Sequence, residues 1–155
     1  EIATAYHEAG HAVMVLYLGR PIQRVSVLVN HQREGFCQLK KGTFRPSPDI
    51  LETEVLILLG GLVAEGQQMG RFCPSGASQD LLGVRSLTRL RAGSDRQIAR
   101  LERRMLAKAE HILGQSDVWP AVQAIAEELL RNTTISGRAA RHLFEETRSR
   151  AGKDR

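Results

Sequence analysis

The pattern of apolar and polar positions predicts a mostly helical chain. Residues 2–18 place their larger apolar side chains on one side of a helix at about 100° per residue, and Gly19 and Pro21 end it in the usual order. Residues 49–68 are apolar nearly all round, which predicts a buried central helix. Amphipathic patterns predict further helices over residues 77–90, 95–113, 117–131 and 138–146.

Short strands are predicted near the N-terminus. Residues 24–29 alternate and are rich in Val, and residues 36–39 form a second short segment after a polar turn. Pro46 and Pro48 mark a following loop, in which Ser47 is a candidate N-cap for the central helix. The pattern therefore predicts a mostly α (α+β) fold with a small two- or three-stranded sheet near the N-terminus.

The domain expected from these elements covers residues 1–146, and the charged residues 147–155 are expected to form a frayed tail. The 155 residues are 42% hydrophobic and 25% charged, as is typical of one globular domain. Two cysteines cannot form a disulfide framework. The longest apolar run is far below the ~20 residues that span a bilayer.

The net charge of +5 comes mostly from arginine and raises the question of a polyanionic partner. The arginines are spread among acidic residues along the predicted helices, as on a solvated helix face. The few aromatic residues are not interleaved with them in a nucleic-acid-binding pattern. No nucleic-acid partner is expected, and a polyanion-binding helical module is the weakest hypothesis for the function.

The sequence His7-Glu8-Ala9-Gly10-His11 is a His-Glu-x-x-His motif. The spacing places both imidazoles on one helix face, one turn apart, where they can bind one Zn²⁺. Glu8 is displaced from both rings by less than a third of a turn, so it flanks the metal and can take a proton from the water that the metal activates. The motif predicts a zinc site with Glu8 as general base.

Catalytic zinc requires a third protein ligand, and the ten residues after His11 offer none. Asp80 lies in a segment that leads from a loop into a helix, where a carboxylate can be aimed inward, although such an Asp ordinarily interacts with the helix dipole. From the residues alone, Asp80 and Glu65 are equal candidates. The other distant candidates are Asp49, Asp95, His31, Cys37 and Cys73.

Three blocks of the chain resemble the peptidase domain of FtsH-type AAA proteases, which are membrane-anchored, ATP-dependent zinc proteases. Thr4–Val13 resembles the opening of that domain, and Leu59–Glu65 resembles its Gly-Gly-x-x-Ala-Glu helix. Ser75–Leu81 resembles the Thr-Gly-Ala-Ser-x-Asp segment that supplies the family's third zinc ligand. The resemblance implies that Asp80 is that ligand and that Glu65 supports the site by orienting a ligand or packing beside the metal.

The resemblance also implies partners and a location. It implies a polypeptide substrate, an ATPase module elsewhere in the parent chain or in trans, and a homo-hexamer. It implies a place at the cytoplasmic face of a membrane, with association through segments outside these 155 residues. No Gly-x-x-x-x-Gly-Lys-Ser/Thr loop occurs in the sequence, so ATP-driven unfolding would come from elsewhere.

The implied activity is zinc-dependent endopeptidase action on unfolded or membrane proteins. Substrate would lie extended along a strand edge, for which Phe36, Cys37, Gln38 and Leu39 are the candidates, and a plain structural hairpin is an equal alternative. Cys37 and Cys73 are expected to be small buried apolar residues, with Cys73 close enough to the Asp80 segment to approach the metal. The alternative function is an inactive peptidase-like module for polypeptide binding or assembly, and the retention of Glu8 favours activity.

Overall fold

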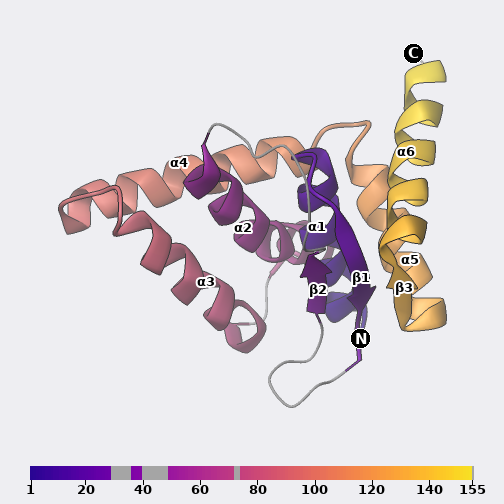
Figure 1. Cartoon of the computed structure of the whole chain (residues 1–155), viewed down its shortest axis with the longest axis horizontal. Coiled ribbons are helices and arrows are strands. Elements are labelled where there is room, and N and C mark those ends of the chain that lie inside the picture. The colour runs from indigo at the N-terminus through magenta and orange to yellow at the C-terminus, as the bar shows by residue number, and fades with distance from the viewer. Residues whose placement is uncertain (29–35, 40–48, 72–73, 155) are drawn as a thin grey trace.

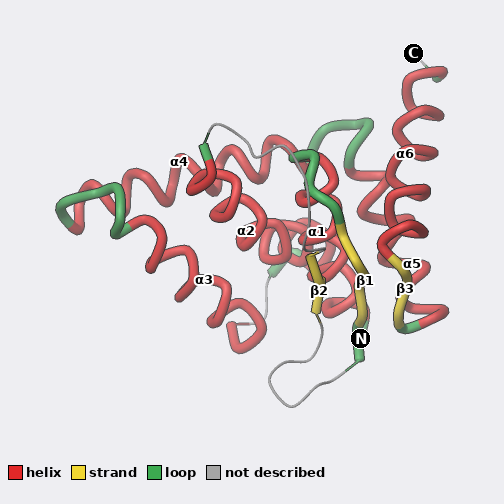
Figure 2. The backbone as a smooth tube through the Cα atoms, in the orientation of Figure 1, coloured by secondary structure: helices red, strands yellow, loops and turns green. Residues whose placement is uncertain are grey.

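A computed structural model describes residues 1–28, 36–39, 49–71 and 74–154 of the chain. Figures 1 and 2 show helices arranged around a short sheet that lies against α1. The elements in chain order are α1 (Ile2–Tyr17), β1 (Ile22–Ser26), β2 (Phe36–Leu39), α2 (Ile50–Met69), α3 (Pro74–Thr88), α4 (Asp95–Leu113), α5 (Trp119–Asn132), β3 (Thr134–Ser136) and α6 (Gly137–Lys153). The predicted fold class is confirmed.

Helices α1 and α2 form the centre of the molecule and cross in close contact. A Cβ atom on Gly10 would lie 2.2 Å from the carbonyl oxygen of Gly60 and 2.5 Å from the Cβ of Ala64. Only a residue without a side chain allows two helix backbones to approach so closely. The close approach at Gly10 and Gly60 holds the motif-bearing face of α1 against α2.

The N-cap of helix α2 is Asp49, whereas Ser47, the predicted cap, lies outside the described residues. The Asp49 carboxylate accepts a hydrogen bond of 2.9 Å from the backbone N–H of Glu52. It also receives two hydrogen bonds from Arg91, at 2.9 and 3.0 Å. The Arg91 guanidinium, followed by the Glu52 N–H, lowers the pKa of Asp49 to about 2. Asp49 thus caps α2 and ties it to the α3–α4 connection.

Replacing Asp49 should separate these two contributions. Asp49→Ala removes the cap and is expected to lower the free energy of unfolding by about 1 kcal/mol. Asp49→Asn keeps a capping oxygen and loses only the exposed ion pair, so its loss should be clearly smaller. Because the pKa is lowered from 3.8 to about 2 on folding, the ion-pair contribution is present above pH 4 and is lost as the pH falls toward 2. Urea unfolding of the three chains at pH 7 and near pH 2 tests this, and equal losses in both variants at pH 7 would contradict the capping role.

The sheet has three antiparallel strands in the order β2-β1-β3. Its third strand comes from the far end of the chain and pairs Ile135 with Val25, both of them core residues. Strand β2 lies at the edge of the sheet and packs near α1. The predicted strand over residues 24–29 is therefore shifted, since β1 ends at Ser26.

The C-terminal segment is helical, so the predicted frayed tail is wrong. Helix α6 continues past Glu146 as far as Lys153. The Arg148 side chain explains this extension, because it forms an ion pair of 3.1 Å with Asp117 and lies over the rings of Tyr17 and Phe144. These contacts fix the segment against the loop before α5 and against the end of α1.

Helix α3 begins earlier than predicted, at Pro74, and packs on α2 before the chain turns back into α4. In Figure 1, α3 and the adjoining half of α4 extend away from the sheet as an arm. Asp80 therefore lies beyond the first turn of the helix, whereas the predicted helix from residue 77 places it within the first turn. Among the described residues, no helix combines the length and apolar character required to cross a membrane.

Candidate metal centre

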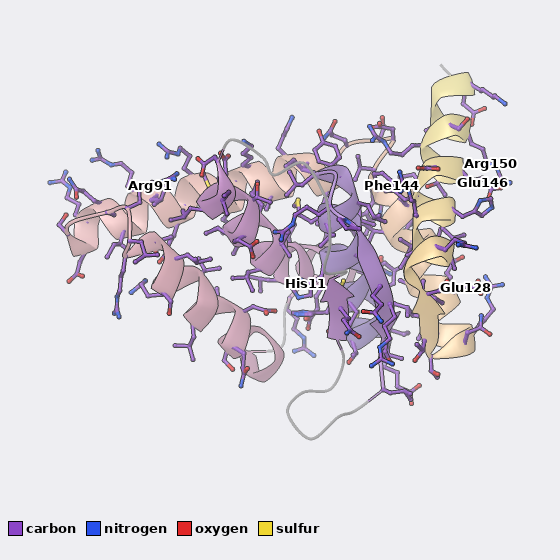
Figure 3. The ribbon with its side chains drawn as sticks, in the orientation of Figure 1. His11, Arg91, Glu128, Phe144, Glu146 and Arg150 are labelled. Carbon is purple, nitrogen blue, oxygen red and sulfur yellow. The ribbon has the colours of Figure 1, made fainter. Side chains whose placement is uncertain are left out.

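The two histidines of the motif face α2 from α1, as their spacing predicts. His7 and His11 are buried, with 8% and 9% of their surfaces exposed. Their Nε2 atoms lie 3.1 Å apart, and the two rings are nearly perpendicular at 79°. Figure 3 shows His11 in the interior of the molecule, whereas the labelled Arg91 and Arg150 lie on its outside.

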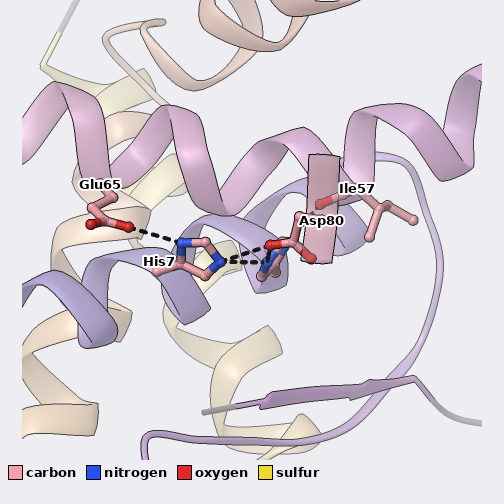
Figure 4. A network of polar contacts seen from close by, with 5 residues as sticks. His7, Ile57, Glu65 and Asp80 are labelled. Carbon is pink, nitrogen blue, oxygen red and sulfur yellow. Dashed lines mark hydrogen bonds and ion pairs between the residues drawn. The ribbon is translucent and has the colours of Figure 1, made fainter. Parts of the chain in front are cut away.

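Asp80 reaches the same point from α3. Its Oδ2 atom lies 2.9 Å from Nε2 of His7 and 3.1 Å from Nε2 of His11 (Figure 4). One ligand atom from each of the three residues lies within 4.8 Å of the other two, and the described residues contain no second cluster of this kind. Two imidazole nitrogens and one carboxylate oxygen are the ligand types of a catalytic zinc site.

The remaining ring nitrogens determine which atoms face this point. Nδ1 of His11 lies 2.7 Å from the carbonyl oxygen of Ile57, which can only accept, so Nδ1 carries a proton and donates it. Nδ1 of His7 lies 3.0 Å from Oε2 of Glu65 and donates to that carboxylate. In the neutral rings both Nε2 atoms then hold lone pairs directed at each other and at Asp80. Three converging lone pairs need a cation between them, so the donor set fits a divalent metal.

The electrostatic surroundings also favour a cation. Burial lowers the pKa of His11, but the hydrogen bond to Asp80 and the negative charges of Glu8 and Asp80 outweigh it and raise the pKa to about 9. Burial raises the pKa of Asp80, but its hydrogen bonds to His11 and His7 hold it well below its usual range. In the metal-free chain, a proton on the His11 ring balances the Asp80 carboxylate, and a divalent ion would displace that proton.

Glu8 lies one residue after His7, with 6% of its surface exposed. The negative charge of Glu8 contributes to the raised pKa of His11, so its carboxylate is within electrostatic reach of that imidazole. Glu65 is also buried and approaches the opposite side of the His7 ring from Asp80. The site thus brings together His7, Glu8, His11, Glu65 and Asp80, and the two carboxylates that were equal candidates for the third ligand occupy different positions.

Three other candidate ligands that the structure describes, Asp49, Asp95 and Cys37, lie outside this cluster. Asp49 caps α2, and Asp95 lies in the first turn of α4, behind the N-cap Ser94. Cys37 is partly buried on β2 and packs against the core, as expected of a small apolar residue. His31 and Cys73 lie outside the described residues.

One part of the site escaped sequence reasoning. The carbonyl oxygen of Ile57 fixes the His11 ring, yet a backbone atom leaves no side-chain signature in a sequence. The mid-helix glycines of α2 were the available signal, since a carbonyl is reached by a side chain most easily where the residue one turn later is small.

Comparison with known proteins agrees with this geometry. The sequence profile of Peptidase family M41 matches residues 1–92, which include the His-Glu-x-x-His motif and Asp80. The chain belongs to this family. Relatives include "ATP-dependent zinc metalloprotease FtsH 4" of Sorangium cellulosum, which is 30% identical over 130 residues, or 81% of this chain and 17% of that protein. "ATP-dependent zinc metalloprotease FtsH 1" of the same organism is 31% identical over 159 residues, 96% of this chain and 23% of that protein.

A third relative of this M41 chain, "ATP-dependent zinc metalloprotease FtsH" of Rickettsia conorii, is 32% identical over 91 residues, 56% of this chain and 14% of that protein. The resemblance to FtsH-type peptidase domains is therefore confirmed. The M41 chain spans less than a quarter of the length of each of these relatives. Each name therefore describes a protein that is much longer than the segment aligned with this chain.

Proposed function

We propose that the chain is a zinc-dependent endopeptidase domain in which His7, His11 and Asp80 hold the metal. The observation that carries the proposal is the convergence of His7 Nε2, His11 Nε2 and Asp80 Oδ2, with both Nδ1 atoms engaged elsewhere. Membership of a zinc metalloprotease family supports the choice of metal and of reaction.

When bound, zinc would supply Lewis acidity toward a peptide carbonyl and a water nucleophile near neutral pH. The chain's own residues would manage the protons. Glu8 would take the proton from the attacking water and pass it to the leaving amine, so that the peptide bond is broken as the amine departs neutral. Its burial beside the imidazole pair supports this role, because a shielded carboxylate exchanges its proton with the reacting groups rather than with solvent.

Glu65 and Ile57 would orient the two imidazoles. Each accepts a hydrogen bond from an Nδ1 atom, which fixes the ring and leaves Nε2 free to bind metal. Substrate would lie along the outer edge of β2, which includes Cys37 and Gln38 as well as Phe36 and Leu39. The place of β2 at the sheet edge near α1 supports this binding mode, in which main-chain hydrogen bonds hold an extended peptide.

The names of the relatives support an ATP-dependent setting for the domain. We propose that it degrades unfolded or membrane proteins as part of a longer ATP-dependent protease, with an ATPase module in the parent chain or in trans. A homo-hexamer at the cytoplasmic face of a membrane, attached through segments outside these residues, is part of the same proposal.

Removing and restoring the metal tests the function. Dialysis of the chain against a strong chelator is expected to abolish hydrolysis of an unfolded substrate such as casein, and one equivalent of Zn²⁺ per chain should restore it. Metal content by mass spectrometry and casein hydrolysis are measured on the same samples. His111→Ala serves as the control, because His111 is exposed on α4 and should leave both quantities unchanged.

The outcomes separate the alternatives. Failure to take up zinc would contradict the proposed site. Stoichiometric zinc without hydrolysis, with and without an added ATPase partner, would instead support the inactive peptidase-like module that binds or assembles polypeptides.

A further inference from the structure

The mid-helix residue Gly61 lies directly against both histidine rings of the candidate metal centre. A Cβ atom on Gly61 would lie 2.5 Å from Nε2 of His11, 2.7 Å from Nε2 of His7 and 2.8 Å from Cε1 of His11. These are the two nitrogen atoms that face Asp80. The two imidazole rings therefore occupy the space that a side chain at residue 61 would fill.

Gly61 also bears on the hydrogen bond that fixes the His11 tautomer. Nδ1 of His11 donates to the Ile57 carbonyl oxygen at 2.7 Å, whereas a Cβ on residue 61 would lie closest to Nε2 and Cε1 of the same ring. A ring pushed aside by that Cβ would carry Nδ1 away from its acceptor. The absence of a side chain at residue 61 therefore supports both the position and the tautomer of the His11 ring.

A methyl group at this position would be incompatible with metal binding. Ordinary contacts between such atoms are about 3.5 Å or longer, so both Nε2 atoms would have to retreat by roughly 0.8–1 Å, whereas metal–ligand distances tolerate about 0.2 Å. We infer that Gly61 is a positioning residue of the metal centre, required for metal affinity rather than for the fold. This inference rests on the proposed function.

Two neighbouring glycines of the same helix provide matched controls. Gly60 faces α1, where an added Cβ would lie 2.8 Å from the backbone oxygen of Gly10, so Gly60→Ala should disturb the helix crossing. Gly66 has no atom within 4 Å of an added Cβ, so Gly66→Ala should leave both fold and metal binding unchanged. The clash at Gly61 involves side-chain rings, which can swing away while the backbone stays in place.

The first experiment measures metal affinity in the full chain. Co²⁺ and Zn²⁺ are titrated into wild-type, Gly61→Ala and Gly66→Ala protein, with the visible spectrum of Co²⁺ reporting coordination and circular dichroism reporting the fold. The metal affinity of Gly61→Ala should fall by about 10–100-fold, the range for disrupting ligand orientation. Its Co²⁺ spectrum should change and its helicity should not. Wild-type affinity and spectrum in Gly61→Ala would overturn the inference and leave the proposed function standing.

A second experiment needs no metal and remains decisive if Gly61→Ala is poorly stable. Thermal unfolding in chelator is compared for Gly61→Ala made in the wild-type chain and in a His7→Ala/His11→Ala chain, as a mutant cycle. With the rings removed, the substitution should raise Tm by about 2–4 °C, since alanine is the better helix former. With the rings present, it should lower Tm. Equal shifts in both backgrounds would overturn the inference.

The two experiments also distinguish this inference from the proposed function. If the wild-type chain takes up no metal, the proposed function fails. The mutant cycle then tests by itself whether Gly61 sets the position of the two rings. Different Tm shifts in the two backgrounds would support this role, and equal shifts would contradict it.

Discussion

Replacing Asp80 by alanine is expected to lower zinc affinity by at least about 100-fold and to abolish hydrolysis. Loss of an outer hydrogen-bond partner already costs about 10–100-fold in metal affinity, and here the oxygen that lies 2.9 and 3.1 Å from the two Nε2 atoms is itself removed. Two imidazoles alone leave the metal without the third ligand that catalytic zinc sites have. Zinc affinity is measured with a competing chromophoric chelator, and hydrolysis with casein.

Asp95→Ala is the matched control for this substitution. Asp95 is also an aspartate near the start of a helix, but it is exposed in the first turn of α4 and belongs to no ligand cluster among the residues that the structure describes. Its removal should cost only a few tenths of a kcal/mol of stability through the helix dipole and leave zinc affinity unchanged. Near-normal zinc affinity in Asp80→Ala would show that another carboxylate completes the site, and Glu65 would be the first to test.

The helices could be predicted because their signals are local. The stripe over residues 2–18 and the apolar run over residues 49–68 follow from the helical period and correspond to α1 and α2 within one or two residues. The N-cap is Asp49 instead of the predicted Ser47, because the Asp49 carboxylate accepts hydrogen bonds from the Glu52 N–H and from the Arg91 guanidinium. The Arg91 partner lies 42 residues away, so no local pattern reveals it.

The strand and the tail near the C-terminus required tertiary information. Thr134–Ser136 is too short to stand out in the sequence, and it becomes a strand because β1 offers an edge to pair with. The residues after Glu146 look like a charged tail. They are helical because Arg148 contacts Asp117 and the Tyr17 ring in other parts of the chain and lies over the Phe144 ring one turn earlier in α6.

The site residues also divide into those that local spacing predicts and those that depend on tertiary packing. The four-residue spacing of His7 and His11 places both rings together without further information. Choosing between Asp80 and Glu65 was not possible from the residues, and the geometry explains why both were reasonable, since both carboxylates contact His7. Glu65 approaches Nδ1 and Asp80 approaches Nε2, a difference that depends on how α2 and α3 pack against α1.

Glu8→Gln is expected to lower the rate of hydrolysis by about 10²–10⁴-fold, the usual contribution of a general base, while zinc remains bound. Glutamine has nearly the same shape as glutamate but cannot accept a proton from water at neutral pH. Because Glu8 lies beside the imidazole pair rather than among the three converging ligand atoms, its replacement leaves those atoms in place. Hydrolysis and zinc content are measured on the same preparation.

Glu65→Gln gives the comparison that makes this result specific. Glu65 holds the His7 ring through Nδ1, so its replacement should weaken zinc binding by about 10–100-fold and lower hydrolysis mainly through loss of metal, with recovery at high zinc concentration. Glu8→Gln should show no such recovery, because its defect concerns proton transfer. Recovery of Glu8→Gln by added zinc would mean that Glu8 contributes its negative charge to metal binding, and the proton acceptor would then have to be another group.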